Sequence, residues 1–182
     1  IAPEYSNLIM YDGLVNFMKA GIECANKVTT VSPTYAKEIL DPWYSYGLDS
    51  ILNQRSWKLC GILNGIDTDS YNPETDKDIW ANYNADDFSN KAKNKAELQK
   101  MMGMNVDPDV PLVGIVSRLV GHKGIDLMKE VLEKSLYERN IQYVVLGSGE
   151  WEYENYFRYL HDKHPDKVGI TIGFVPDLAR KI

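Results

Sequence analysis

The residue types best suited to chemistry lie in the segment Val113–Gly124, where Arg118 and Lys123 follow a short apolar run and precede a helical pattern beginning at Ile125. The first amides of a helix are unpaired donors, and the helix dipole favours negative charge at that end. Two fixed cations beside such amides can bind a diphosphate. The segment therefore predicts a nucleotide-diphosphate site, and the alternative is a pair of solvated surface cations.

Two further loops carry residues that suit the same site. Gly147-Ser148-Gly149-Glu150 and Gly173-Phe174-Val175 each follow a predicted strand. Ligands of open parallel sheets bind beyond the carboxyl ends of the strands, so we expect these loops to face one crevice. Glycines in the first loop would let backbone amides approach a ligand, although such a pair of glycines is more often a tight turn than a binding loop. The loop lacks the third glycine of a dinucleotide fingerprint, which argues against an NAD site.

Hydrophobic periodicity predicts the elements that position these loops. Short apolar runs alternate with amphipathic helical patterns, which indicates parallel sheets with right-handed crossovers. In the second half of the chain the predicted strands are 112–117, 141–146 and 168–172, and the predicted helices are 124–138 and 151–163. In the first half we expect helices at 13–26, 33–40 and 48–54, and strands at 27–31 and 59–63.

The composition divides the chain into three parts. Residues 64–110 are rich in Asn, Asp, Lys and Pro, and only 91–102 has helical character. We therefore expect 1–64 to be the end of one domain, 65–110 to be an interdomain connector, and 111–182 to be the start of another domain. The predicted fold class is α/β, with parts of two doubly wound Rossmann-like domains built on parallel sheets.

Other reactive side chains are expected to be structural. Ser32 suits a helix N-cap, with Pro33 at the first helical position, and no G-x-S-x-G surrounds it. Cys24 and Cys60 lie within apolar stretches and are expected to be buried thiols. His161 and His164 are expected to be exposed to solvent at the charged end of a helix. No metal-ligand spacing occurs, so neither a metal nor a cofactor is expected.

The charge balance narrows the classes of partner. The 182 residues carry a formal net charge of −6. Proteins that bind nucleic acid or membrane surfaces use a basic face, so neither partner is expected. No apolar run reaches the roughly 18 residues that span a bilayer, and the first residues do not look like a signal peptide. We expect a cytoplasmic location.

Several segments together resemble a known family. They are Lys19-Ala20-Gly21, Thr30–Ile39, Tyr46–Asp49, Gly61–Asp67, Asn72–Asp76, and Ser117-Arg118-Leu119 with Lys123-Gly124. In this order they resemble motifs of bacterial glycogen synthases and plant starch synthases. These are retaining glycosyltransferases with the GT-B fold of two Rossmann-like domains, so the resemblance implies a GT-B fold for this chain.

The resemblance also implies roles for individual residues. Arg118 and Lys123 would be catalytic, because in the family these cations hold the diphosphate of the sugar donor and stabilise charge on the leaving group. His122 stands where the family usually has glutamine. Phe174 matches a position that is commonly tyrosine near the nucleotide base, where it would stack, with core packing as the alternative. The expected nucleotide-sugar-binding residues are Ser117, Arg118, Lys123, Gly147, Gly149 and Phe174.

The implied reaction is transfer of glucose from a nucleotide-diphosphate glucose to the non-reducing end of an α-1,4-glucan, with retention. ADP-glucose and UDP-glucose both fit, as do glycogen and starch. The family's K-x-G-G-L loop does not occur in the sequence, and its C-terminal E-x(7)-E motif would follow Ile182, so we expect a fragment that is inactive alone and self-associates through exposed apolar surface. The alternatives are a GT-B enzyme with another acceptor and a non-catalytic nucleotide-binding module.

Overall fold

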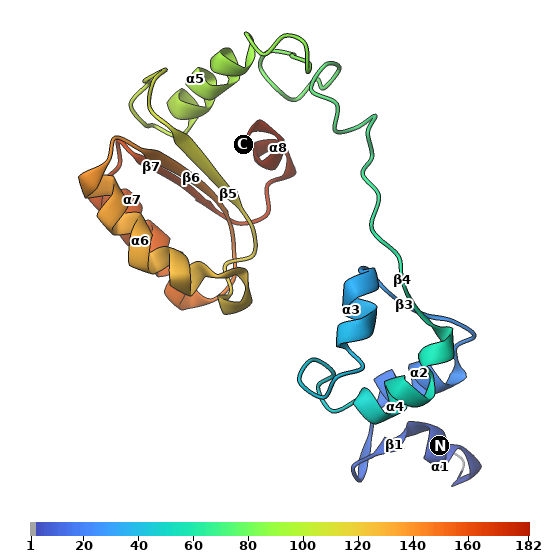
Figure 1. The fold of residues 1–182 in the computed structure, drawn as a ribbon. Coiled ribbons are helices and arrows are strands. Elements are labelled where there is room, and N and C mark those ends of the chain that lie inside the picture. Colours follow the sequence, from blue (N-terminus) through green and yellow to red (C-terminus); the bar gives the residue numbers. More distant parts are fainter. Residues whose placement is uncertain (1–2) are drawn as a thin grey trace. The chain divides into compact units, whose positions relative to one another are not determined.

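The computed structural model describes residues 3–182 and contains two compact units. The first unit ends at Ile66, and the second covers Asp67–Ile182 (Figure 1). Each unit contains a parallel sheet with helical crossovers, so the expected α/β class is confirmed. The second unit includes residues 67–110, which the composition predicts as a connector.

The first unit begins with short elements that the hydrophobic pattern did not predict. η1 (Pro3–Tyr5) and α1 (Ser6–Ile9) precede an antiparallel hairpin of β1 (Met10–Tyr11) and β2 (Leu14–Val15). Asp12 and Gly13 both have positive φ, as tight hairpin turns require. The predicted helix therefore starts too early: α2 (Phe17–Cys24) begins after Asn16, whose side chain accepts a hydrogen bond from the Lys19 amide.

The parallel sheet of the first unit has two strands. β3 (Val28–Thr30) pairs with β4 (Leu59–Gly61), and the chain between them forms α3 (Pro33–Glu38), α4 (Asp49–Gln54) and η2 (Ser56–Lys58). Ser32 Oγ accepts a hydrogen bond from the Tyr35 amide at 3.1 Å, which confirms its role as the N-cap of α3. A Cβ at Gly61 would overlap the backbone of Ser32 and Pro33, so β4 can pass this turn only with a glycine.

The core of the first unit is small. Ile22, Ile51 and Leu52 are its buried members. The expectation of buried thiols is wrong, because Cys24 and Cys60 are both exposed. Within the described residues Ile22 is the one buried side chain of α2, so this core is too small to cover both cysteines.

The second unit has a three-stranded parallel sheet in the order β5-β6-β7. Its strands are β5 (Leu112–Val116), β6 (Gln142–Gly147) and β7 (Val168–Ile172). Its helical elements are α5 (Lys91–Met101), η3 (Gly121–Lys123), α6 (Ile125–Glu138), α7 (Trp151–Lys163) and α8 (Pro176–Lys181). The strands and helices predicted after residue 111 are confirmed to within one residue at each end.

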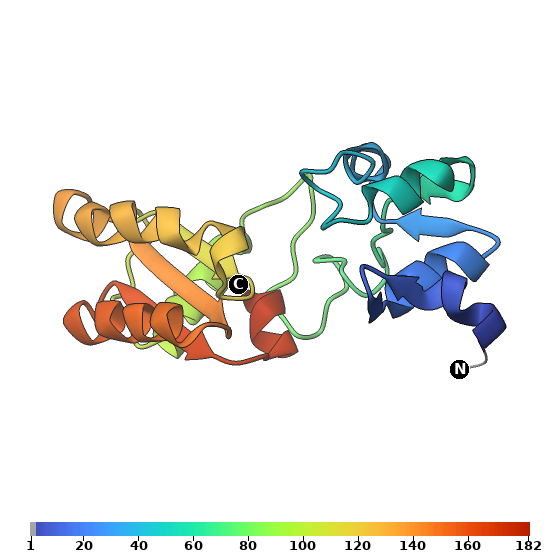
Figure 2. The ribbon, with the colours of Figure 1, turned by 90° about the horizontal axis from the view of Figure 1, so that it is seen from below.

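The two faces of this sheet have separate cores. Every residue of the central strand β6 is buried, and alternate residues point to opposite faces. Tyr143 and Val145 pack against α6 and α7, whereas Val144 and Leu146 pack with Leu98 of α5. Figures 1 and 2 show α6 and α7 together on one face and α5 and α8 on the other. The sheet is therefore covered on both sides, as parallel sheets require.

The expected exposure of the two α7 histidines is wrong. His161 is half-buried, and its Nδ1 lies 2.6 Å from the Val168 carbonyl oxygen. His164 is also half-buried, and its ring meets the Tyr137 ring edge-on at 5.0 Å between centroids. The turn from α7 to β7 brings the His161 ring against β7, whereas His164, the C-cap of α7, places its ring against α6.

Candidate nucleotide-binding site

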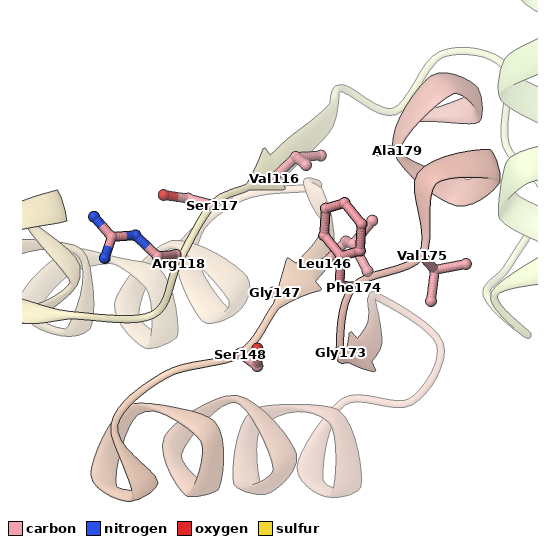
Figure 3. Close-up of a pocket in the computed structure, with 10 residues that line it drawn as sticks. All are labelled: Val116, Ser117, Arg118, Leu146, Gly147, Ser148, Gly173, Phe174, Val175 and Ala179. Atoms are coloured by element: carbon pink, nitrogen blue, oxygen red, sulfur yellow. The ribbon is translucent and has the colours of Figure 1, made fainter.

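A pocket of about 220 Å³ lies at the carboxyl ends of the three strands of the second unit (Figure 3). Ligands of doubly wound sheets bind at this edge. Whole small-molecule sites usually measure about 300–1,000 Å³, so this pocket could hold part of a nucleotide sugar. Its lining residues are Val116, Ser117, Arg118, Leu146, Gly147, Ser148, Gly173, Phe174, Val175 and Ala179.

The pocket brings together most of the residues that the sequence indicated. Ser117 and Arg118 follow β5, Gly147 ends β6, and Phe174 follows β7. The Phe174 side chain is 90% exposed, which rules out core packing and leaves its ring free. Lys123 and Gly149 lie in the neighbouring loops but outside the pocket lining.

Two of the strand-end loops are joined through their backbones. The Leu119 amide donates to the Ser148 carbonyl at 3.0 Å, and the Glu150 amide donates to the Leu119 carbonyl at 2.8 Å. A Cβ at Gly147 would overlap the Ser117 carbonyl oxygen, and one at Gly149 would overlap that of Leu119. Both glycines are therefore needed for this close approach, which also fixes the position of the loop that carries Arg118.

The junction between β5 and α6 has no side-chain cap on the first amides of α6. Gly124, at the N-cap of α6, has φ 73° and supplies no capping side chain. Lys123 is exposed in η3, immediately before this helix. Arg118 is exposed as well, and its Nη2 lies 3.3 Å from His122 Nε2. In Figure 3 the Arg118 side chain extends away from the Phe174 ring. The junction thus combines two cations with uncapped helix amides, which suits an anionic ligand.

The junction between β6 and α7 is different. Glu152 and Glu154 lie in the first turn of α7, and Glu150 is the N-cap residue. Glu154 Oε1 accepts a hydrogen bond from the Gly149 amide at 2.9 Å, and Glu150 Oε1 lies 3.4 Å from the Gly121 amide. Carboxylates already occupy this helix end, so a second anion would be repelled. The charges therefore favour a phosphate at the β5–α6 junction.

The sequence did not single out three residues of the pocket wall. Val116 is the last residue of β5, Leu146 is the next-to-last residue of β6, and Ala179 lies in α8. The ends of the apolar runs could have indicated the first two residues. Ala179 gave no signal, because its role depends on how α8 packs against the sheet.

The described residues 3–182 contain neither a candidate metal cluster nor a candidate membrane-spanning helix. In that part of the chain, no group of three or more His, Cys, Asp or Glu side chains could hold a metal ion. Over the same residues, no helix is long and apolar enough to cross a membrane.

Comparisons with known proteins agree on one family. Residues 3–54 match the family model described as the starch synthase catalytic domain. The chain is 51% identical over 175 residues to the glycogen synthase of Clostridium acetobutylicum, covering 96% of this chain and 36% of that protein. It is 49% identical to the glycogen synthase of Exiguobacterium sibiricum, with the same shares covered. The chain thus spans about a third of the length of these relatives.

Solved structures give the same result. The catalytic domain of starch synthase IV from Arabidopsis thaliana, bound to ADP and acarbose, matches with a TM-score of 0.85 and 39% identity. The match covers 92% of this chain and 35% of that chain. Anabaena Alr3699/HepE in complex with UDP matches with a TM-score of 0.50 at 15% identity, which shows a shared fold alone.

Proposed function

This chain belongs to the glycogen and starch synthase family of GT-B glycosyltransferases, and we propose that it supplies the donor-diphosphate site of such an enzyme. The proposed reaction transfers glucose from ADP-glucose to the non-reducing end of an α-1,4-glucan, with retention. The observation that carries the proposal is the pocket at the strand ends, where Arg118 and Phe174 come together. The ADP bound to the Arabidopsis relative supports an adenine nucleotide.

Arg118 and Lys123 would act on the departing nucleotide. As the bond between the sugar carbon and the phosphate oxygen breaks, negative charge builds up on the terminal phosphate of the leaving ADP. Cations and helix amides that are already in position stabilise this charge without reorganising. Their bonds strengthen as the charge develops, so they lower the barrier more than they tighten substrate binding.

Phe174 would act on the other end of the nucleotide. Its exposed ring lies beside the apolar side chains of Val175 and Ala179 at one wall of the pocket. An aromatic ring in this setting can stack on a purine base. Stacking is similar in the ground state and the transition state, so it would contribute to donor binding and little to kcat.

Substitutions in a full-length synthase carrying this sequence test the proposal. A hydrogen bond to a charged group contributes roughly 1.5–3 kcal/mol, so Arg118→Ala and Lys123→Ala should each lower kcat/KM for ADP-glucose by about ten- to a hundred-fold. Arg118→Lys should recover part of the loss, because it keeps the charge without the planar fork. Phe174→Ala should mainly raise the donor KM.

Lys134→Gln is the matched control. It removes one cation from an exposed ion pair on α6, outside the pocket, and should leave the kinetics unchanged. Unchanged kcat/KM in both Arg118→Ala and Lys123→Ala would contradict the proposed site. A preference for UDP-glucose over ADP-glucose would leave the assignment of the diphosphate site intact, and it would show that the base is uracil and not adenine.

A further inference from the structure

One wall of the nucleotide pocket is made by a helix that is too short to be stable alone. α8 has six residues, and isolated helices of fewer than about 12 residues are marginal in water. Ala179, on this helix, lines the pocket, as does Val175 immediately before it. Leu178 fixes one side of α8 by packing in the same core as Val144 and Leu146. The shape of the pocket therefore depends on what holds the other side.

Arg180 holds that other side through four contacts to one segment. Its Nη1 donates to the Ser70 carbonyl oxygen at 2.6 Å and to Asp76 Oδ2 at 3.0 Å. Its Nε lies 3.7 Å from Asp78 Oδ2, and its Cζ lies 4.7 Å from the centre of the Tyr71 ring. The Arg180 side chain is 22% exposed and that of Asp76 is 8% exposed, so this ion pair is well shielded from water.

The segment on which Arg180 acts has no regular secondary structure. Residues 70–80 form turns and bends, and Ser70 and Asp76 lie 110 and 104 positions before Arg180 in the sequence. A second contact reinforces the first, because Lys181 Nζ lies 5.5 Å from the centre of the Trp80 ring. A hydrogen bond from the Asp78 amide, together with the Arg180 guanidinium, holds the pKa of the Asp76 carboxyl below its ordinary value. Asp76 is therefore ionised at neutral pH.

We propose that Arg180, paired with Asp76, is a positioning residue that fixes α8 and thereby sets the wall of the pocket beside Phe174. The inference rests on the proposed donor site and adds a residue that does not line the pocket. Because α8 forms the apolar wall, its displacement weakens binding of the nucleoside part of the ligand. Arg118 and Lys123 belong to the junction between β5 and α6, so a displacement of α8 leaves their contacts to the diphosphate unchanged.

Titration calorimetry with AMP and ADP on the 182-residue chain tests this inference. A substitution at a residue that acts on a binding site through other residues typically alters the affinity of that site for its ligand about 2- to 30-fold. Arg180→Gln and Asp76→Asn should each raise the Kd for AMP and the Kd for ADP. Within each variant both Kd values should rise by the same factor, inside this range. The double variant should be no weaker than Arg180→Gln alone, because Arg180→Gln already removes the pair with Asp76. Arg180→Lys should recover part of the affinity, and Lys134→Gln is the charge-matched control.

Hydrogen exchange separates positioning from loss of the fold. In Arg180→Gln, amides of α8 should exchange faster while those of the central strand β6 keep their protection. If ADP binds the unmodified chain but both single variants bind AMP and ADP normally, the inference is overturned and the donor site stands. Additive losses in the double variant would also overturn it. If the unmodified chain does not bind ADP, the proposed function fails and this inference fails with it.

Discussion

The two units of the chain differ in how they are stabilised. The second unit encloses its central strand between two cores, which contain Phe157, Leu160 and Val168 on one face and Leu98 and Leu178 on the other. The first unit has one small core, whose buried members are Ile22, Ile51 and Leu52. Large apolar side chains there are strongly exposed, among them Phe17, Trp57 and Leu63. The second unit can therefore hold a binding site rigidly. The first unit exposes large apolar side chains, and it would be stabilised if another surface covered them.

Exposed apolar side chains of this size favour association between molecules. The self-association that the sequence predicts therefore remains an expectation for this chain. Light scattering should show an apparent mass that rises with concentration, and a clean monomer over a wide concentration range would contradict it.

The largest predicted effect on stability is in the second unit. Phe157 of α7 is fully buried in the core that α6 and α7 form with the sheet, and its ring packs edge-on against Tyr156. Phe157→Ala should lower the free energy of unfolding of this unit by about 3–5 kcal/mol, because it leaves a cavity in a close-packed core. Urea denaturation followed by hydrogen exchange would show the loss in β5–β7. A loss below about 1 kcal/mol would indicate a loosely packed core.

An intermediate effect is expected from a polar contact of the first unit. The Lys58 side chain is 3% exposed and donates to the carbonyl oxygens of Glu23 and Ala25 at 3.0 and 2.7 Å. These carbonyls lie at the end of α2, where no further helix amide can pair with them. Lys58→Met keeps the length of the side chain and leaves both acceptors unpaired.

We expect Lys58→Met to cost about 1–3 kcal/mol. Faster hydrogen exchange should appear in α2 and β4, with the second unit unchanged. Equal losses of protection in both units would contradict their description as separate units.

The smallest predicted effect concerns the cap of α3. Ser32→Ala removes the hydrogen bond to the Tyr35 amide and should destabilise the first unit by about 1 kcal/mol. Ser32→Thr, which keeps the hydroxyl, is the matched control and should lose less. Thermal unfolding of the chain gives the loss of stability, and hydrogen exchange of the α3 amides locates it. Faster hydrogen exchange of the β6 amides, in the second unit, would contradict the prediction for Ser32→Ala.

Local patterns in the sequence predicted most of the second unit. Residues 151–163 show an amphipathic helical period and residues 168–172 form a short apolar run, so α7 and β7 were predicted at their observed bounds. The β1–β2 hairpin was missed because the apolar period of α2 was extended backward across the turn at Asp12-Gly13. The Asp-Gly pair itself was the signal that could have found it.

The site was predicted as far as its residues lie next to strand ends. Ser117, Arg118, Gly147 and Phe174 come together because parallel strands end at one edge of the sheet. The contribution of α8 could not be read from the sequence, because it depends on the Arg180–Asp76 pair across more than 100 residues. The glycines at 147 and 149 were noticed for a ligand, but the structure shows that they allow two loops to approach.

The most direct test of the donor site compares ADP with AMP. We predict that Arg118→Ala and Lys123→Ala each raise the Kd for ADP by about ten-fold or more, as expected for losing a hydrogen bond to a charged group. The Kd for AMP should change much less, because AMP lacks the terminal phosphate. Titration calorimetry on the chain and its variants measures both values. Equal ADP affinity in the unmodified chain and both variants would contradict the assignment of these cations to the diphosphate.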